Sequence, residues 1–295
     1  MTEKVSEKYS DIDIWSTKDM IKEMFQGQVE AVAAIEVSIN NIVEAAEAAA
    51  IRLEGSGRLV YVGAGTSGRL AVQDGAELTP TFAWPPERTI FCMAGGMGAL
   101  TVSVEGAEDN LEAGAREMDK INLNINDVVI AVAASGSTPY TLGAVSRSND
   151  IGALTIGISN NPNTALIANA KHAILVETGS EIIAGSTRMK AGTTQKAILN
   201  MLSTAIMTKL GRVYKGLMVD MIVSNDKLEK RAINMVCEIT HCSQEIAINA
   251  LQVADNHIKT AVLISFGESL SKSRILLNKV NGNLRYALEA INTNE

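Results

Sequence analysis

The chain reads Gly63-Ala64-Gly65-Thr66-Ser67-Gly68-Arg69 directly after an apolar run, Leu59–Val62. The run predicts a buried strand, and the pattern after it predicts a helix that begins at Thr66 or Ser67. A glycine turn between a strand and a helix presents backbone N–H groups at the positive end of the helix dipole. The two hydroxyl groups add further donors. The stretch therefore predicts a phosphate-binding turn in an α/β fold.

The composition is that of an ordinary globular protein. The 295 residues suffice for one large α/β domain and a smaller addition. Apolar residues make up 46% and charged residues 20% of the chain. The net charge of −7, the 4% aromatic content and the lack of a basic stripe argue against a nucleic-acid partner. An anionic ligand would have to be held by local donors.

The start of the chain and its cysteines predict a reduced, cytoplasmic protein. Met1–Lys8 lacks the apolar segment of a signal peptide, and no apolar run reaches the roughly 18 residues of a membrane span. Cys92, Cys237 and Cys242 form neither a CxxC pair nor a disulfide framework. Cys92 lies in an apolar strand pattern, so we expect a buried thiol.

Helical spacing of apolar residues from Ser16 to about Leu53 predicts one long amphipathic helix. Ser16 and Asp19 resemble a capping box at its start, and Gly55-Ser56-Gly57 ends it. Its apolar face has two possible partners, the chain's own sheet or a second subunit.

Strands alternate with helices after Gly57, and most of the strands are continuous apolar runs, typical of strands covered on both faces. The five expected strands are Leu59–Val62, Thr89–Met93, Val128–Ala133, Leu154–Ile158 and Ala173–Val176. The connections are long enough for crossover helices, so the fold class is a three-layer α/β domain with a mainly parallel sheet. Ligands of such sheets bind beyond the carboxyl ends of the strands. Three loops fall there: Gly63–Gly68, Ala94–Gly96 and Ala134–Thr138.

A helical pattern runs from Lys190 to Leu210 and stops at Gly211, and no strong strand pattern follows Asp226. Asn234–Ala254 and Ser271–Ala290 predict short helices. Three parts are expected: residues 1–54 as an N-terminal helical segment on the core or on a dimer partner, 55–225 as the α/β domain, and 226–295 as a small helical domain.

The glycine turn also matches a dinucleotide-binding fingerprint. That site requires an acidic residue at the end of the second strand, about 20 residues further on. The second strand ends in Phe91–Gly96, which contains no carboxylate. Thr66 and Ser67 suit a phosphate monoester, so phosphate is favoured over NAD.

A second hydroxyl-rich loop, Ser135-Gly136-Ser137-Thr138, follows the third expected strand. Such a turn forms an anion-binding concavity, although its hydroxyls could also serve only to cap a helix. The neighbouring glycine turn favours phosphate binding. A third segment, Glu181–Thr193, places Arg188 and Lys190 before a long helix. Because cations oppose the dipole at a helix start, a ligand or Glu181 must supply negative charge there.

Carboxylates are the candidates for acid/base chemistry. Glu77 lies three turns into the helix after the glycine turn or just past its end, and Glu105 and Glu108 are spaced to share a helix face. Each could instead be a solvated surface group. The three histidines, His172, His241 and His257, are scattered without metal-ligand spacing, so no metal site is expected.

Taken together, the motifs resemble N-acetylmuramic acid 6-phosphate etherases. They are Gly63–Arg69, Val104–Asp109, Ala133–Pro139, Gly185–Gly192, Asn200–Thr204 and Leu217–Asp220. The resemblance covers nearly the whole chain in the expected order. It implies a sugar isomerase (SIS) domain with a helical C-terminal addition. It also implies a homodimer with active sites near the subunit interface, and no metal or organic cofactor.

The resemblance implies cleavage of the D-lactyl ether at C3 of N-acetylmuramic acid 6-phosphate, in peptidoglycan amino-sugar recycling. It assigns Glu77 as the proton donor and Glu108 as the second carboxylate, which removes the C2 proton. It further implies phosphate binding by Thr66, Ser67, Ser135, Ser137 and Thr138, and contacts on or behind the sugar ring by Glu181 and Ser186. Relatives commonly carry Glu where this chain has Met97, a departure that bears on the local loop.

Two other functions share these features. A non-catalytic sugar-phosphate sensor needs the hydroxyl loops but not both carboxylates, so the presence of Glu77 and Glu108 favours an enzyme. A sugar-phosphate isomerase shares the removal of the C2 proton, but it releases no lactate.

Overall fold

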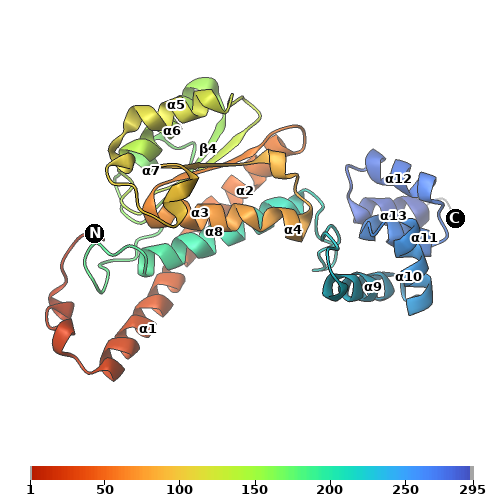
Figure 1. Ribbon diagram of the computed structural model, residues 1–295, viewed down its shortest axis with the longest axis horizontal. Coiled ribbons are helices and arrows are strands. Elements are labelled where there is room, and N and C mark those ends of the chain that lie inside the picture. The colour runs from red at the N-terminus through yellow and green to blue at the C-terminus, as the bar shows by residue number, and fades with distance from the viewer. Residues whose placement is uncertain (1, 293–295) are drawn as a thin grey trace. The chain divides into compact units, whose positions relative to one another are not determined.

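The computed structural model describes residues 2–292 (Figure 1). The chain divides into two compact units, Met1–Ala76 with Glu87–Ala205, and Glu77–Pro86 with Ile206–Glu295. One division between them falls inside α8 (Lys190–Lys209) rather than at residue 226. The roles that the sequence suggests for residues 1–54, 55–225 and 226–295 remain predictions.

A five-stranded sheet forms the centre of the first unit. Its strands are β1 Leu59–Gly63, β2 Thr89–Met93, β3 Val128–Val132, β4 Leu154–Ser159 and β5 His172–Leu175. All pairs are parallel, in the order β2-β1-β3-β4-β5. The predicted strands and the α/β fold class are confirmed, and each strand end lies within one residue of the expected one. The inner strands β1, β3 and β4 are buried at every residue, as expected of central parallel strands, whereas the edge strands β2 and β5 are partly exposed.

Helices cover both faces of this sheet. They are α2 Ile39–Leu53, α3 Gly65–Ala76, α5 Leu111–Lys120, α6 Pro139–Ile151, α7 Ala165–Asn169 and the first part of α8. Figure 1 shows α5 and α6 on one face, with α2, α3 and α8 on the other. Two glycines bring α5 and α6 together: a Cβ on Gly114 would lie 1.9 Å from the carbonyl oxygen of Tyr140, and one on Gly143 would lie 1.9 Å from that of Leu111. Any larger residue would force these helices apart.

Cys92 lies in the core under α5 and α6, where it is 2% exposed, so the prediction of a buried thiol is confirmed. Burial raises the pKa of this thiol to about 12. Cys92 is therefore a neutral, apolar packing residue at ordinary pH.

The long helix predicted from Ser16 to Leu53 is interrupted. The structure has α1 (Thr17–Ala33), a 3-10 segment (Ala34–Ser38) and then α2. The predicted cap at Ser16 is present, since its hydroxyl accepts the N–H of Asp19 at 3.1 Å. In the 3-10 segment the Ser38 hydroxyl donates to the Leu175 carbonyl at the end of β5. This long-range bond fixes the start of α2 over the sheet, and no local pattern predicts it.

The second unit is helical. Besides α4 (Leu78–Phe82) and the end of α8, it contains α9 Asp226–Thr240, α10 Gln244–Val253, α11 Ile258–Ser265, α12 Leu270–Lys279 and α13 Leu284–Asn292. These helices bury an apolar core of their own, with Val236, Val262 and Leu263 completely enclosed. Among residues 2–292, none of the helices has the length and apolar character needed to cross a membrane.

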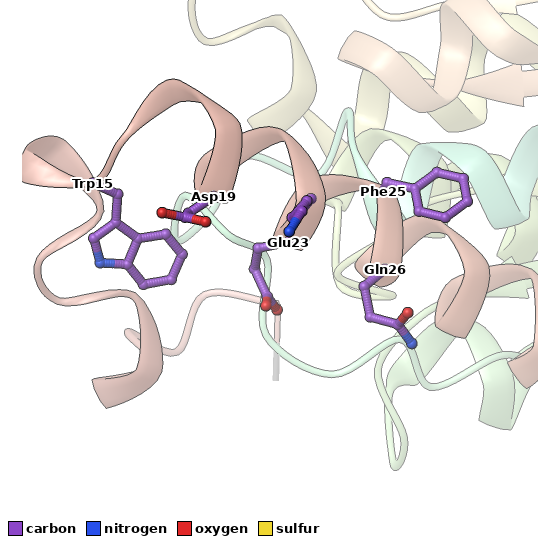
Figure 2. Close-up of a pocket in the computed structure, with 6 residues that line it drawn as sticks. Trp15, Asp19, Glu23, Phe25 and Gln26 are labelled. Atoms are coloured by element: carbon purple, nitrogen blue, oxygen red, sulfur yellow. The ribbon is translucent and has the colours of Figure 1, made fainter.

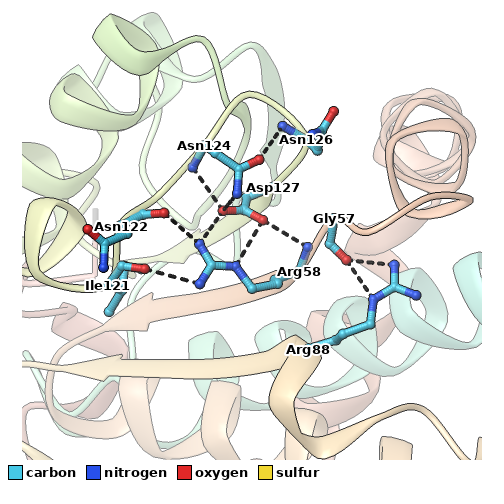
Figure 3. Close-up of polar contacts among 8 residues, drawn as sticks. All are labelled: Gly57, Arg58, Arg88, Ile121, Asn122, Asn124, Asn126 and Asp127. Carbon is cyan, nitrogen blue, oxygen red and sulfur yellow. Dashed lines mark hydrogen bonds and ion pairs between the residues drawn. The ribbon is translucent and has the colours of Figure 1, made fainter.

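A polar cluster closes the amino edge of the sheet, where β1 and β3 begin (Figure 3). The Asp127 side chain is fully buried, and its Oδ1 accepts the backbone N–H of Arg58 at 2.9 Å. Its Oδ2 accepts from Nη2 of Arg58 at 2.6 Å and from the backbone N–H of Asn124 at 2.9 Å. The guanidinium also donates to the carbonyls of Ile121 and Asn122 at 3.0 Å. One carboxylate thus ties the starts of two neighbouring strands together.

Candidate functional site

The glycine turn joins β1 to α3 at the carboxyl edge of the sheet. A Cβ on Gly68 would lie 2.9 Å from the carbonyl oxygen of Gly63, and a Cβ on Gly63 would lie 2.9 Å from the Cα of Gly68. Neither position can hold a larger side chain without moving backbone. The glycines therefore let the first turn of α3 press against the end of β1, with Gly65 at a φ of +51°. This is the strand, turn and helix arrangement that the sequence predicts.

A cavity of about 270 Å³ opens beside this turn. It is lined by Ala64, Gly65 and Arg69, by Met93 and Ala94 at the end of β2, and by Ala99 and Ser103–Glu108. The Arg69 guanidinium fixes the far wall, because its Nη2 donates to the Ala99 carbonyl at 2.9 Å and its Nε to the Leu100 carbonyl at 3.0 Å. The sequence interpretation gave Arg69 no role, although it ends the glycine motif.

Glu105 and Glu108 line this cavity, but they do not share a helix face. The structure places Glu105 in a turn and Glu108 in a short 3-10 segment, Ala107–Asp109, with Gly106 at a φ of +69° between them. The expectation from their spacing is therefore wrong about the helix. Both side chains are exposed. A cavity that contains two carboxylates beside a turn at the start of a helix can bind a polar ligand and exchange protons with it.

Behind the glycine turn, Ser67 begins a chain of buried hydrogen bonds. Its hydroxyl donates to Oε1 of Gln195 at 2.9 Å, and Nε2 of Gln195 donates to Oδ1 of Asn160 at 2.9 Å. Nδ2 of Asn160 donates in turn to Oγ1 of Thr194 at 2.8 Å. Sequence reasoning missed Gln195 and Asn160, and the only local signal was the polar run at the start of α8. Thr66, beside Ser67, is half-buried.

The second hydroxyl loop follows β3, the neighbour of β1 in the sheet. Thr138 is the residue before α6, yet its side chain makes no capping hydrogen bond. Oγ of Ser135 instead accepts the N–H of Ser137 at 3.2 Å and lies 3.3 Å from Oγ1 of Thr138. A simple capping role therefore does not account for Thr138, which fits the interpretation as a phosphate loop. Its contact with substrate remains a prediction.

Glu181 is only 1% exposed and caps α8. Its Oε2 accepts the N–H of Lys190 at 2.9 Å and its Oε1 accepts the N–H of Ala191 at 2.8 Å. Glu181 thus provides the negative charge expected at this helix start. Ser186 is half-buried in the loop before α8, and Arg188 is exposed.

Glu77 lies just past the end of α3, one of the two positions that the sequence allows. It is the residue before α4, it is exposed, and its backbone carbonyl accepts the N–H of Thr81 at 3.2 Å. It belongs to the second compact unit, whereas Glu108 and the hydroxyl loops belong to the first.

The end of α3 is anchored by a buried carboxylate, Asp74, which sequence reasoning did not single out. Asp74 accepts from the Tyr61 hydroxyl at 2.8 Å, from Nδ2 of Asn200 at 2.6 Å and from the Ser203 hydroxyl at 3.0 Å. Burial and this carboxylate raise the pKa of Tyr61 well above its usual value. The network fixes α3 against β1 and α8. Within residues 2–292, no group of His, Cys, Asp and Glu side chains is arranged to hold a metal ion.

Comparison with known proteins places these motifs in one family. A protein from Deinococcus radiodurans named N-acetylmuramic acid 6-phosphate etherase is 45% identical over 296 residues, covering 99% of this chain and 97% of its own length. The chain belongs to the N-acetylmuramic acid 6-phosphate etherase family. An etherase of the same name from Bacillus subtilis is 43% identical and covers 93% of this chain and 90% of its own length.

Two domain families and one solved structure agree with the SIS fold expected for this etherase family. Residues 39–149 match the glucokinase regulatory protein N-terminal SIS domain, and residues 105–205 match the SIS domain. The structure of a phosphoheptose isomerase from Francisella tularensis is similar with a TM-score of 0.51 and 20% identity, covering 66% of this chain and all (100%) of that one. At this identity the likeness shows the fold alone.

Proposed function

We propose that this chain cleaves the D-lactyl ether of N-acetylmuramic acid 6-phosphate and yields N-acetylglucosamine 6-phosphate and D-lactate. The observation that carries the proposal is the near full-length match to proteins named as this etherase. The cavity adds support, since it joins a phosphate-type glycine turn to Glu105 and Glu108. The reaction would serve cell-wall amino-sugar recycling in the cytoplasm.

The proposed reaction is an elimination followed by hydration. In the open-chain sugar the C1 carbonyl acidifies the C2 proton, which Glu108 removes. The electrons of that C–H bond form the C2–C3 double bond, the C3–O bond breaks, and Glu77 protonates the departing lactate oxygen. Water then adds to C3 as a hydroxyl group and gives its other proton to Glu77, and Glu108 returns its proton to C2. The elimination releases lactate and the hydration adds water with no net oxidation or reduction, so the proposal includes neither a metal nor an organic cofactor.

We assign the phosphate to the two hydroxyl loops. Thr66 from the β1 turn, and Ser135, Ser137 and Thr138 from the β3 loop, would supply hydroxyl and backbone donors. Ser67, whose hydroxyl donates to Gln195, would contribute its backbone N–H. Neighbouring parallel strands support this assignment, because their carboxyl ends lie at one edge of the sheet. Glu181 and Ser186 would act behind the sugar ring, Glu181 through its cap on α8.

The experiment that tests the proposed function is D-lactate release from N-acetylmuramic acid 6-phosphate by the purified chain in excess EDTA. We expect stoichiometric lactate and N-acetylglucosamine 6-phosphate at a rate that the chelator does not change. Ketose formation without lactate would indicate an isomerase instead. Tight binding of the sugar phosphate without turnover would indicate a sensor.

We further propose that two copies of the chain associate through α1. Large apolar side chains form a stripe on this helix, with Ile21 57%, Phe25 68%, Val29 47% and Val32 50% exposed. Phe25 also borders a hollow lined by Trp15, Asp19, Lys22, Glu23 and Gln26 (Figure 2). A continuous apolar stripe of this kind is typical of an interface, and the family resemblance implies a homodimer.

The α1 interface predicts that Phe25→Glu converts a dimer into a monomer. A charge placed on the apolar stripe would have to be desolvated in the interface, which favours dissociation. Sedimentation velocity measures the change. The matched control is Ile275→Glu, which alters a side chain of similar exposure, 66%, on α12. A wild-type monomer, or a dimer that persists in Phe25→Glu, would contradict the prediction.

A further inference from the structure

The second unit contains a buried ion pair that the proposed reaction does not use. Lys259 is 3% exposed and Asp220 is 8% exposed, and Nζ of Lys259 donates to Oδ2 of Asp220 at 2.6 Å. Burial lowers the pKa of Lys259, and the Asp220 carboxylate opposes that shift. Since neither charge is well solvated, each depends on the other to remain in the core.

Arg212 connects this pair to α4. Its Nη1 lies 3.5 Å from Oδ2 of Asp220 and donates to the carbonyls of Phe82 at 3.2 Å and Ala83 at 3.3 Å. The guanidinium also lies 5.9 Å from the centre of the Trp84 ring. The last carbonyls of a helix lack partners within it, and a cation there stabilises the negative end of its dipole. Arg212 therefore caps the C-terminal end of α4.

The chain next to Asp220 also holds α4 through its backbone. The N–H of Ile222 donates to the Pro80 carbonyl at 3.2 Å, and inside α4 the N–H of Thr81 donates to the Glu77 carbonyl at 3.2 Å. Glu77 thus shares the first hydrogen-bonded turn of α4. Its position within the second unit follows the position of this helix, to which both Arg212 and the Asp220 segment are hydrogen-bonded.

We propose that Arg212, held by the buried Asp220–Lys259 pair, is a positioning residue for Glu77. It fixes α4, and through α4 it places the carboxyl group of Glu77, which in its protonated form protonates the departing lactate oxygen. This inference rests on the proposed function, because it concerns the acid of that reaction. It predicts that loss of Arg212 weakens protonation of the leaving group and leaves removal of the C2 proton unchanged.

The test compares two leaving groups in Arg212→Met. One substrate is N-acetylmuramic acid 6-phosphate, and the other carries chloride at C3 in place of the lactyl ether. Chloride leaves with the electrons of the C3–Cl bond and takes no proton, so its elimination needs the base but not the acid. We expect kcat for lactate release to fall about 10- to 100-fold, because general acid catalysis is weakened. KM, and kcat for chloride elimination, should stay within about twofold of wild type.

Three other variants serve as controls for this comparison. Glu77→Gln provides the reference pattern, a loss confined to the lactyl substrate. Arg212→Lys keeps a cation near the α4 carbonyls and should recover part of the rate. Lys272→Met removes an exposed cation whose partner is Glu268 in the same unit, and it should change neither reaction.

Two outcomes for a folded Arg212→Met variant would contradict the inference. Equal losses with both leaving groups would show that Arg212 supports only the fold, and a normal rate of lactate release would show that it does not position Glu77. If Arg212→Met fails to fold, as judged by circular dichroism, Arg212→Lys decides by the same comparison. A wild-type chain inactive on both substrates would overturn the proposed function and this inference with it. If the wild-type chain is active but Arg212→Met slows both reactions equally, only the inference about Arg212 would be overturned.

Discussion

Replacement of Glu77 by glutamine is expected to lower kcat for D-lactate release by about 10²- to 10⁴-fold, the range for loss of a general acid. Glutamine has nearly the shape of glutamic acid, but its amide is far too weak an acid to protonate the leaving oxygen. Because Glu77 is exposed, the change should leave the fold intact. The measurements are a coupled D-lactate assay, thermal unfolding, and calorimetric binding of N-acetylglucosamine 6-phosphate.

The control for this variant is Glu87→Gln, which neutralises another exposed glutamate close by in the sequence and should keep full activity. Exchange of deuterium from D₂O into C2 then distinguishes acid from base. If proton removal precedes C–O cleavage, Glu77→Gln should still exchange the C2 proton, and Glu108→Gln should not. Near-normal turnover in Glu77→Gln would exclude this carboxylate from the mechanism.

The largest loss of stability is expected from Asp127→Ala. This change should lower the free energy of unfolding by about 3–5 kcal/mol, because it leaves a guanidinium and two backbone N–H groups without their buried partner. Urea unfolding followed by circular dichroism measures the loss. The rate of lactate release, assayed well below the melting temperature, should change little, since the cluster lies at the amino edge of the sheet and the cavity at the carboxyl edge.

A second ion pair of the same unit provides the control. Asp119 pairs with Arg147 at 2.7 Å, but both side chains are largely solvated, 54% and 41% exposed. Asp119→Ala should therefore cost at most about 1 kcal/mol. If both variants lost the same stability, burial of Asp127 would not be the source of its effect.

The sheet could be predicted from sequence because central parallel strands have a local signature. Runs such as Val128–Val132 are apolar at every position and lie between glycine or polar turns. The prediction of one helix from Ser16 to Leu53 is less accurate, since spacing alone shows neither the 3-10 segment Ala34–Ser38 nor the bond from Ser38 to Leu175. Periodicity reports which residues are apolar. It does not show which distant carbonyl a serine hydroxyl will hydrogen-bond.

The candidate site shows the same limit. The motifs located the glycine turn and the carboxylates, and Glu105 and Glu108 do line one cavity. The prediction that they share a helix face is wrong, because Gly106 between them adopts a left-handed conformation that no continuous helix can contain. The bond from Ser67 to Gln195 joins residues 128 positions apart, so only the folded chain reveals it.

One edge of the sheet anchors the strands and the other carries the candidate site. This separation affects how proteins with this fold can diverge. The Asp127 cluster that ties β1 to β3 lies at the amino edge, and the turns around the cavity lie at the carboxyl edge. Residues in the turns can therefore be substituted, and the reaction changed, while the Asp127 cluster at the opposite edge still holds β1 and β3 in register.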